Sequence, residues 1–525
     1  MKKWQLIICL LNVLVLFTEP NSATAVDSSD MLFIDTVVYK YNLHFYCSDW
    51  ADSLAYYKSF DEEYIPARFV CYLPGRDSIV MDSVGVRYKG NSSYADVGSS
   101  TKKSFKFNFQ KYVDGRKFFG VEKLNLNNND KDPTLMREKI SYDILRKYMP
   151  ASRVAYADLY VDSTRIGVYT QVENIDKKFL KRHYKNEDCN LYKAADQGAT
   201  LEYYSVNQSD YGAYYELKTN EDENNWADFI LFLYKLNNTP DDSFGIVMGK
   251  RLNLDLCIRY LAFNAVFSNF DSYTGSGRNF YMYDDSGSGL FTLIPWDLNL
   301  SFGAYSSNSW DVNAVDIVNY SNLANHPLMQ KIFANDSLLQ IYFKYIKEFI
   351  NNEASADSLA AMIEHNRAVI DSAASTDSNL LYTYNNFIKN TDSLVIISVS
   401  GKRTGIPGLK SFCHTRDSVI LVQLANYSPV SYNAKLKNVG GCQLKCGGFT
   451  GNKLKMTYNV TGNSDYVKIG IYDCSGRLAK VFDEGAKNAG TYTNIWNAGN
   501  ASAGYYMVKA SIGGKTAIST IVLTK

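Results

Sequence analysis

The stretch Phe291-Thr-Leu-Ile-Pro-Trp-Asp-Leu-Asn-Leu-Ser-Phe-Gly303 decides how the rest of the chain is interpreted. The apolar run Leu290 to Pro295 predicts a buried strand, and Asp297 follows shortly after that strand ends. A carboxylate at this point is costly unless a cation or a hydrogen-bond donor meets it. Either a bound divalent metal ion or the N-terminus of a helix would satisfy the requirement, and the stretch alone does not choose between them.

The residues before this stretch add a second acid and an amide. Asp271 precedes a loop of small residues, 272–277, and Asn279 follows that loop at the start of a strand predicted over 280–283. The order is therefore acid, loop, asparagine, strand, turn, strand, acid. Phosphoryl-transfer enzymes of the protein-kinase type need one acid beside the nucleophile, then an asparagine and a second acid on magnesium. The standard kinase motifs are absent in their usual spelling.

The composition is that of a folded protein, and its net charge does not indicate a strongly charged partner such as nucleic acid or an anionic membrane. The chain has 525 residues, long enough for two or three domains with a large core. Its net charge of +1 gives no argument for binding nucleic acid or an anionic membrane. With five histidines in all, a histidine-rich metal site or a Ser-His-Asp triad has little to draw on.

Residues 1–25 have the features of a secretory signal peptide. Lys2 and Lys3 supply the positive start, residues 6–17 are apolar but too few for a comfortable membrane span, and Ala23-Thr-Ala25 fits the cleavage pattern. No later stretch reaches membrane-spanning length. We therefore expect a chain without a transmembrane span that crosses the periplasm and is secreted or displayed at the cell surface.

Two neighbouring strands carry residues suited to phosphate. A strand predicted over 78–88 runs into Lys89-Gly-Asn-Ser-Ser93, where small and hydroxylic residues either turn backbone N–H groups toward phosphate or form an ordinary hairpin turn. The strand over 102–109 has a phenylalanine face that includes Lys103 and a polar face that includes Lys106. A lysine here is either a cation that pairs with phosphates or a solvated residue of an edge strand.

A helix and a hairpin follow these strands. The helix is predicted over 134–148, and Glu138 early in it can pair with a strand lysine or with a neighbour on the helix surface. The hairpin, built from 154–161 and 167–172, is closed by Glu173, which lies near a nucleotide base or ribose, or else caps the next helix. This order of elements resembles the small lobe of a kinase.

The chain from there to residue 424 is predicted to be mainly helical. A helix over 254–270 would place Asp271 at its C-terminal end, whereas residues 125–129 are expected to form a polar loop and the Tyr-rich segment 189–215 has no assignment. Helices are expected over 50–60, 174–184, 225–236, 254–270, 327–333, 337–352, 355–372, 380–388 and 409–424.

The pattern changes after about residue 425 to short strands separated by turns. These predict a small β-sandwich over residues 440–525. Its phrases Val467-Lys-Ile-Gly-Ile-Tyr-Asp473 and Ala503-Gly-Tyr-Tyr-Met-Val508 resemble the sorting domains of the type IX (Por) secretion system. The resemblance implies that this domain engages the secretion machinery.

Several phrases between residues 84 and 302 resemble the CotH family, the spore-coat protein H kinases. In chain order they include Gly85-Val-Arg-Tyr-Lys-Gly-Asn-Ser-Ser93, Lys102-Lys-Ser-Phe-Lys106, Lys123-Leu-Asn-Leu126, Leu135-Met-Arg-Glu138, Gly167-Val-Tyr169, Asn279-Phe-Tyr-Met-Tyr283 and Pro295-Trp-Asp-Leu298. The resemblance implies an α+β, atypical protein-kinase-like fold of two lobes over residues 33–426. It also implies binding of ATP with Mg²⁺ or Mn²⁺, and transfer of the γ-phosphate to Ser or Thr of a secreted or cell-surface protein.

The same resemblance assigns roles by position. It implies that Asp297 binds the metal, that Asn279 is a second metal ligand, and that Asp271 is the catalytic acid. Contacts to the cofactor are implied for Lys103, Lys106, Glu138, Glu173, Asn91 and Ser92. The family often has a second Asp where this chain has Asn299, so one charge is missing at that position.

A second function is compatible with the same residues. A surface binding or adhesion protein would keep the kinase-like fold without turnover and bind a partner through the Tyr-rich surface around 192–215. The neutral Asn299 and the scarcity of ATP outside cells favour this alternative.

Overall fold

The structure is a computed structural model that describes residues 27–60, 63–73, 77–305, 311–427, 444–450, 452–473, 478–499, 501 and 504–523. It has the mixed α+β character predicted from the sequence. The predicted signal peptide, 1–25, lies outside the described residues. Every helix within the described ranges is too short or too polar to cross a bilayer.

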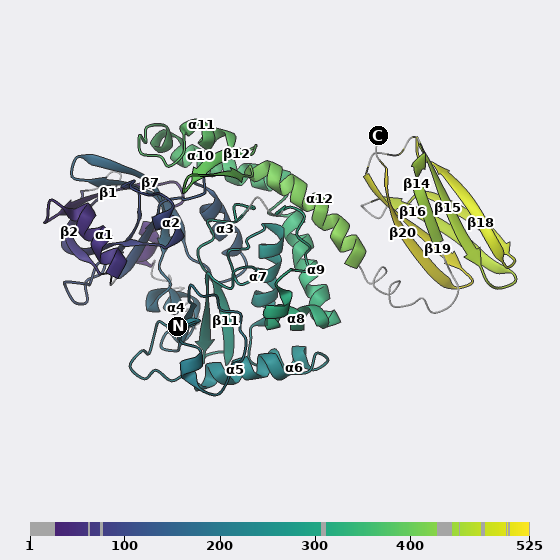
Figure 1. The fold of residues 1–525 in the computed structure, drawn as a ribbon, viewed down its shortest axis with the longest axis horizontal. Coiled ribbons are helices and arrows are strands. Elements are labelled where there is room, and N and C mark those ends of the chain that lie inside the picture. The colour runs from purple at the N-terminus through teal and green to yellow at the C-terminus, as the bar shows by residue number, and fades with distance from the viewer. Residues whose placement is uncertain are drawn as a thin grey trace, which may run out of the picture.

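Residues 38–173 form a closed β-barrel with the strand order β1-β2-β3-β4-β5-β7-β6 (Figure 1). Strands β1 and β6 pair in parallel and so close the circle, which leaves no open strand edge. Phe69, Phe105 and Phe107 belong to its buried core. The strands are β1 (Val38–Phe45), β2 (Ile65–Tyr72), β3 (Ile79–Lys89), β4 (Ser104–Asn108), β5 (Lys123–Asn127), β6 (Val154–Val161) and β7 (Thr164–Glu173).

The prediction of a polar loop at residues 125–129 was wrong for 125–127, which belong to strand β5, whereas 128–129 lie in the loop that follows it. Leu124 and Leu126 are buried in the barrel core, whereas Asn125 and Asn127 alternate with them and face a cavity. Asparagine is a poor strand former, but the burial of the leucines and the pairing with β4 and β7 offset that preference.

Helix α3 (Arg137–Leu145) follows the barrel strand β5 and packs against β6. It begins later than the predicted residue 134 because Leu135 has a φ of +59°, a left-handed conformation that cannot belong to a right-handed helix. The other helices among the barrel strands and directly after them are α1 (Trp50–Phe60), with the predicted bounds, α2 (Ser92–Ala95) and α4 (Lys177–His183).

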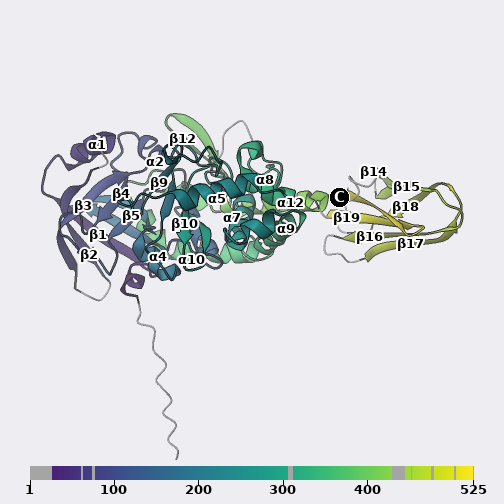
Figure 2. The ribbon, with the colours of Figure 1, turned by 90° about the horizontal axis from the view of Figure 1, so that it is seen from below.

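A second sheet, with the order β11-β10-β8-β9, lies beside helices α5 to α9 (Figures 1 and 2). Its strands are β8 (Leu191–Ala194), β9 (Tyr215–Leu217), β10 (Phe280–Asp285) and β11 (Leu290–Pro295). The helices are α5 (Ala227–Asn238), α6 (Phe244–Met248), α7 (Leu254–Val266), α8 (Pro327–Ala334) and α9 (Asp336–Asn351). Helix α7 ends before the predicted residue 270, because Ser268 is left-handed with a φ of +43°. Asp271 therefore lies in a loop and not at the end of a helix.

Three further helices and a hairpin complete this part of the chain. The helices are α10 (Ala356–Ser375), α11 (Tyr384–Lys389) and α12 (Leu409–Tyr427). The hairpin β12 (Val395–Val399) and β13 (Lys402–Ile406), which was not predicted, packs its inner side chains against Leu300 and Ala304, just after Asp297.

The C-terminal strands form two sheets, β14-β15-β18 and β17-β16-β19-β20, that share one buried cluster including Leu454, Ile469, Trp496 and Val508. The strands are β14 (Leu444–Thr450), β15 (Lys453–Val460), β16 (Asp465–Asp473), β17 (Leu478–Lys487), β18 (Gly490–Asn497), β19 (Gly504–Ile512) and β20 (Lys515–Leu523). The short strands separated by turns that the sequence predicts for this region are thus present.

Candidate active site

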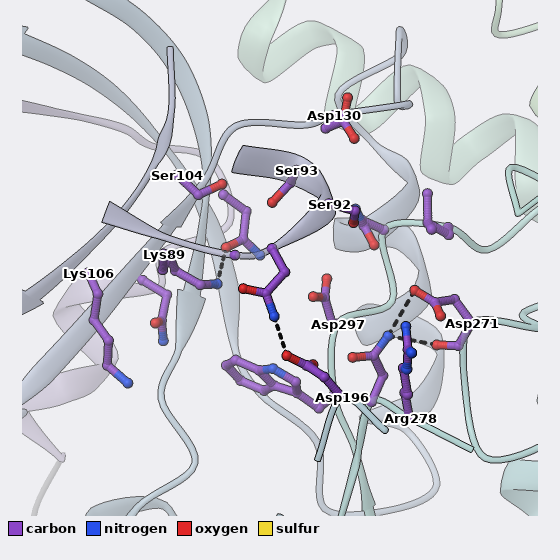
Figure 3. Close-up of a pocket in the computed structure, with 18 of the residues that line it drawn as sticks. Lys89, Ser92, Ser93, Ser104, Lys106, Asp130, Asp196, Asp271, Arg278 and Asp297 are labelled. Atoms are coloured by element: carbon purple, nitrogen blue, oxygen red, sulfur yellow. Dashed lines mark hydrogen bonds between the residues drawn. The ribbon is translucent and has the colours of Figure 1, made fainter. Parts of the chain in front are cut away.

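A cavity of about 660 Å³ is lined by strands β3 to β5 of the barrel, by strands β8 to β10 of the second sheet, and by the loops between them (Figure 3). Lys89 and Lys106 lie on one side of it, Asp271 and Arg278 on the other, and Asp196 and Asp297 between them. Its charged lining residues are Arg87, Lys89, Lys106, Lys193, Lys218, Arg278, Asp130, Asp196, Glu216, Asp271 and Asp297. Cations and carboxylates in one enclosed space suit a polyanion bound together with a metal ion.

Asp297 follows strand β11 and reaches into this cavity. The described residues directly after it, up to 305, contain no helix, so Asp297 does not cap a helix that follows its own strand. Its φ is +51°, and its backbone N–H donates to the Tyr142 hydroxyl at 3.0 Å. Burial raises the pKa of its carboxyl, and Lys89 nearby works against that rise.

The loop after α7 brings Asp271 and Asn279 into direct contact. The side-chain amide of Asn279 donates to Asp271 Oδ2 at 3.0 Å and to the Asp271 backbone carbonyl at 2.8 Å, while the Ser276 hydroxyl donates to Oδ1 at 2.9 Å. Burial raises the pKa of Asp271, although these donors and Arg278 oppose the rise. The pairing of an acid with an asparagine across this loop, inferred from sequence order alone, is present in the structure.

Glu138 connects to the cavity through a hydrogen-bond chain. Asn127 donates its amide to both carboxylate oxygens of Glu138 at 2.9 Å, and its own oxygen accepts from Lys89 Nζ at 2.5 Å. Burial and the neighbouring Asp297 raise the pKa of Glu138 to about 8. Glu138 is therefore linked to a strand lysine through Asn127 rather than by the direct pair that one interpretation expected, and because Glu138 is buried, the surface pair is wrong.

That lysine is Lys89, which the sequence analysis did not single out. It lies at the end of β3, its Nζ is 5.6 Å from the centre of the Trp296 ring, and burial lowers its pKa while Asp297 and Glu138 raise it. The signal was present, because Lys89 ends a predicted strand directly before the Gly-Asn-Ser-Ser turn. Only the fold shows that this lysine, rather than Lys103, faces the acids.

The two lysines singled out on β4 differ in position. Lys106 lines the cavity and is half-buried, and desolvation together with Arg87 nearby lowers its pKa well below the usual range. Lys103 is not among the lining residues: its Nζ donates to the backbone carbonyls of Tyr94 and Gly98 and lies 4.2 Å from the Tyr94 ring centre. Because β4 has a neighbour on each side in the barrel, the interpretation as an edge strand is wrong.

Asn91 and Ser92 also line the cavity, at the start of the short helix α2. Gly90 before them has a φ of +82°, and a Cβ there would lie 2.3 Å from the Ser93 hydroxyl, so the turn requires glycine. The Asn91 side chain donates to Asp196 across the cavity and accepts from Lys58 at 3.2 Å.

Glu173 lies elsewhere. It is buried between Arg153, at 2.7 Å, and Arg182, at 2.5 Å, and does not line the cavity. Burial alone would raise its pKa, but the two guanidinium groups hold the pKa below its ordinary value. The cap of helix α4 is Asp176, so the capping interpretation of Glu173 is wrong, and its position gives no support for a contact to a nucleotide base.

The oxygen donors of the cavity fit a hard divalent cation. Among the described residues, no group of three or more His, Cys, Asp or Glu side chains is gathered for a metal. Asp297 and the Oδ1 atom of Asn279 are nevertheless carboxylate and amide oxygens in one cavity, and Asn279 holds Asp271 through its nitrogen. Mg²⁺ and Mn²⁺ prefer such ligands and take the rest from phosphates and water. Asn299 lines the same cavity and adds a neutral oxygen.

The Tyr-rich segment is largely internal. Tyr192, Tyr211 and Tyr215 are buried in the core, whereas Tyr204 is 40% exposed and stacks on Tyr214. Tyr192 and Tyr215 lie on strands β8 and β9 of the second sheet, so the segment offers less surface to a partner than its composition indicated.

The chain belongs to the CotH kinase family. The family model described as CotH kinase protein matches residues 86–419, a span that contains every residue lining the cavity. Inner spore coat protein H of Bacillus subtilis (strain 168) is similar to this chain, with 28% identity over 229 residues. That alignment covers 42% of this chain and 59% of the length of the Bacillus protein. The predicted family is thus confirmed, while the family match ends before the C-terminal strands.

Proposed function

We propose that this chain is an atypical protein kinase that transfers the γ-phosphate of ATP to Ser or Thr of a secreted or cell-surface protein. The observation that carries the proposal is the meeting, in one cavity, of the Asp271–Asn279 pair, Asp297, and the Lys89–Asn127–Glu138 chain. Family membership supports the kinase class.

The chemistry follows from these positions. Asp297 and Asn279 Oδ1 would hold Mg²⁺ or Mn²⁺, which neutralises phosphate charge when bound. Lys89, kept in place by Asn127, would bind phosphate oxygens. Asp271 would accept the proton of the acceptor hydroxyl. The oxygen of that hydroxyl would then form a bond to the γ-phosphorus, while the bond between this phosphorus and the β,γ-bridging oxygen breaks and ADP leaves. Positioning and electrostatics then supply most of the rate.

The proposal extends to the domains. The barrel with α3 would be the small lobe and the α-helical part the large lobe of a kinase-like domain over residues 33–426. Residues 440–525 would form a β-sandwich that directs the chain through type IX secretion after signal-peptide export. The two C-terminal sheets with a shared core support the sandwich, and the sequence phrases support its sorting role.

Nucleotide binding is tested by thermal unfolding of the chain with ATP, in the presence and absence of Mg²⁺ or Mn²⁺. A ligand that binds only the folded state raises the midpoint. We expect a metal-dependent rise that Asp297→Ala abolishes and that Asp284→Ala, an acid on β10 outside the cavity lining, leaves intact. A well-folded chain without any shift would favour the non-catalytic surface binding protein.

A further inference from the structure

A second cavity, of about 560 Å³, adjoins the loop that carries Asp271. Ser276 connects it to the candidate active site, because Ser276 lines the second cavity and its hydroxyl donates to Asp271 Oδ1 at 2.9 Å. Tyr305 lines it as well, and burial and the nearby Asp271 raise the pKa of its hydroxyl. A molecule in this cavity therefore lies next to the proposed catalytic acid without occupying the space around Lys89 and Asp297.

The wall between the two cavities is held in one shape. A Cβ on Gly275 would lie 2.1 Å from the Phe270 carbonyl oxygen, so the loop comes close to itself where only glycine fits. Asn322, which also lines the second cavity, donates its amide to the Gly275 carbonyl at 2.7 Å. The surface is thus formed before any ligand arrives, which lowers the entropic cost of binding.

The lining differs in kind from that of the first cavity. Three aromatic residues contribute to it, Phe270, Tyr305 and Tyr320, and the rings of Phe270 and Tyr320 meet edge to face at 6.2 Å. Asp316 is the one charged residue among the described residues that line it. The Oδ1 atom of Asp316 already accepts from the Tyr427 hydroxyl at 2.7 Å. This lining is unsuited to a phosphate or a nucleotide and suited to an apolar side chain with polar main-chain groups around it.

We propose that the second cavity binds the acceptor polypeptide, by seating an apolar or aromatic side chain of an extended segment close to the Ser or Thr that is phosphorylated. The inference rests on the proposed function, since it places the second substrate of that reaction. Asn319, Ser321 and Asn322 at the rim supply polar groups for the main chain of the segment. The substrate class is thus an unfolded or loop segment with an apolar residue near its hydroxyl.

The test uses a peptide library with one fixed serine and randomised flanks, and the full chain in two variants. Ser321→Trp fills the second cavity, which we call the groove, from an exposed position at its rim. Ser418→Trp is the matched control, because Ser418 lies on the exposed face of α12 and does not line the second cavity. One arm measures which peptides are phosphorylated with Mg²⁺ and ATP. The other arm measures which peptides are retained by the immobilised chain, without nucleotide, so that it does not depend on catalysis.

We expect both arms to select an apolar or aromatic residue near the serine, at least fivefold over random. Ser321→Trp should remove the selection and leave the thermal shift with Mg²⁺ and ATP unchanged, while Ser418→Trp changes neither.

If peptides are retained selectively, this retention is lost in Ser321→Trp, and no peptide is phosphorylated, the groove is supported and the kinase proposal is overturned. Phosphorylation without preference, or a preference that survives Ser321→Trp, would overturn the groove and leave the kinase standing. Self-association of the chain that Ser321→Trp abolishes, with no peptide selected, would assign the groove to a second copy and also overturn the inference.

Discussion

Asn127 donates its side-chain amide to both carboxylate oxygens of Glu138, each at 2.9 Å. The contact joins strand β5 of the barrel to helix α3, and Lys89 donates to the oxygen of the same amide. A neutral asparagine thus links the buried Glu138 to the half-buried Lys89. Both side chains are thereby held near Asp297.

Replacing Asn127 with Ala should weaken this arrangement. The substitution leaves the buried Glu138 carboxyl group without the Asn127 hydrogen bonds, which costs about 1–3 kcal/mol. We expect a lower midpoint of urea unfolding and weaker ATP binding. Asn125→Ala is the control on the same strand, since the Asn125 amide donates only at 3.4 Å. Equal loss of nucleotide affinity in both variants would contradict a special role of Asn127.

Substitutions of Lys89 and Lys103 should have different effects, one mainly on catalysis and the other mainly on stability. Lys89→Met removes the cavity cation that faces Asp297, and we expect kcat/KM to fall by about two orders of magnitude. Lys103 ties the segment 94–98 through backbone carbonyls, so Lys103→Met should lower the unfolding midpoint and change kcat much less. Steady-state kinetics and thermal unfolding of the two variants check this. The opposite ranking would show that the lysine was wrongly assigned.

Removing one partner of the buried ion pair between Lys102 and Asp377 should strongly destabilise the fold. The Nζ–Oδ2 distance is 2.6 Å, neither side chain is exposed, and Asp377 also accepts from the Val168 N–H. Lys102→Met would leave a buried carboxylate uncompensated, at a cost of about 3–5 kcal/mol in urea unfolding. Lys177→Met breaks the exposed pair with Asp188 and should cost less than about 1 kcal/mol. Similar costs in the two variants would refute this distinction.

Asp417 should make stability depend on pH. Burial raises its pKa to about 7, and Arg416 beside it opposes that rise. Because the folded pKa lies above the unfolded value of about 3.9, the group's contribution is fully present below pH 4 and is lost as the pH rises toward 7. Asp417→Asn removes this titration, so the variant should gain stability relative to the parent chain between pH 4 and pH 8. Urea unfolding at pH 4 and pH 8 measures the free energy of unfolding of the variant relative to the parent chain. The same relative value at both pH values would contradict the prediction.

Local pattern predicted most of the elements well. The helix Trp50–Phe60 and the strand Val154–Val161 have the predicted bounds, because apolar periodicity and flanking turns determine them locally. Strand β5 was missed since its asparagines look like a loop, and only its partners β4 and β7 make it a strand. Tertiary pairing therefore decided where local preference was weak.

The candidate site was predictable only in part. Asp271, Asn279 and Asp297 were singled out from their order along the chain, and the structure places all three in the lining of one cavity. The sequence did not show which lysine lies close to the acids. Lys89 ends β3, Lys103 directly precedes β4 and Lys106 lies on β4, so all three are at or near neighbouring strands. The choice depends on how the barrel closes. Glu173 was expected to contact the cofactor, but it pairs with Arg153 and Arg182 and does not line the cavity, and neither arginine is close to it in sequence.

The decisive measurement is transfer of labelled phosphate from γ-labelled ATP to Ser or Thr, in the chain itself or in a serine-containing peptide library. We predict metal-dependent transfer that falls by at least about two orders of magnitude in Asp271→Asn and in Asp297→Ala. The control variant Asp284→Ala should retain it. Absence of transfer from a folded chain that binds ATP and metal, or transfer that survives Asp271→Asn and Asp297→Ala undiminished, would contradict the proposal that this cavity is a kinase active site.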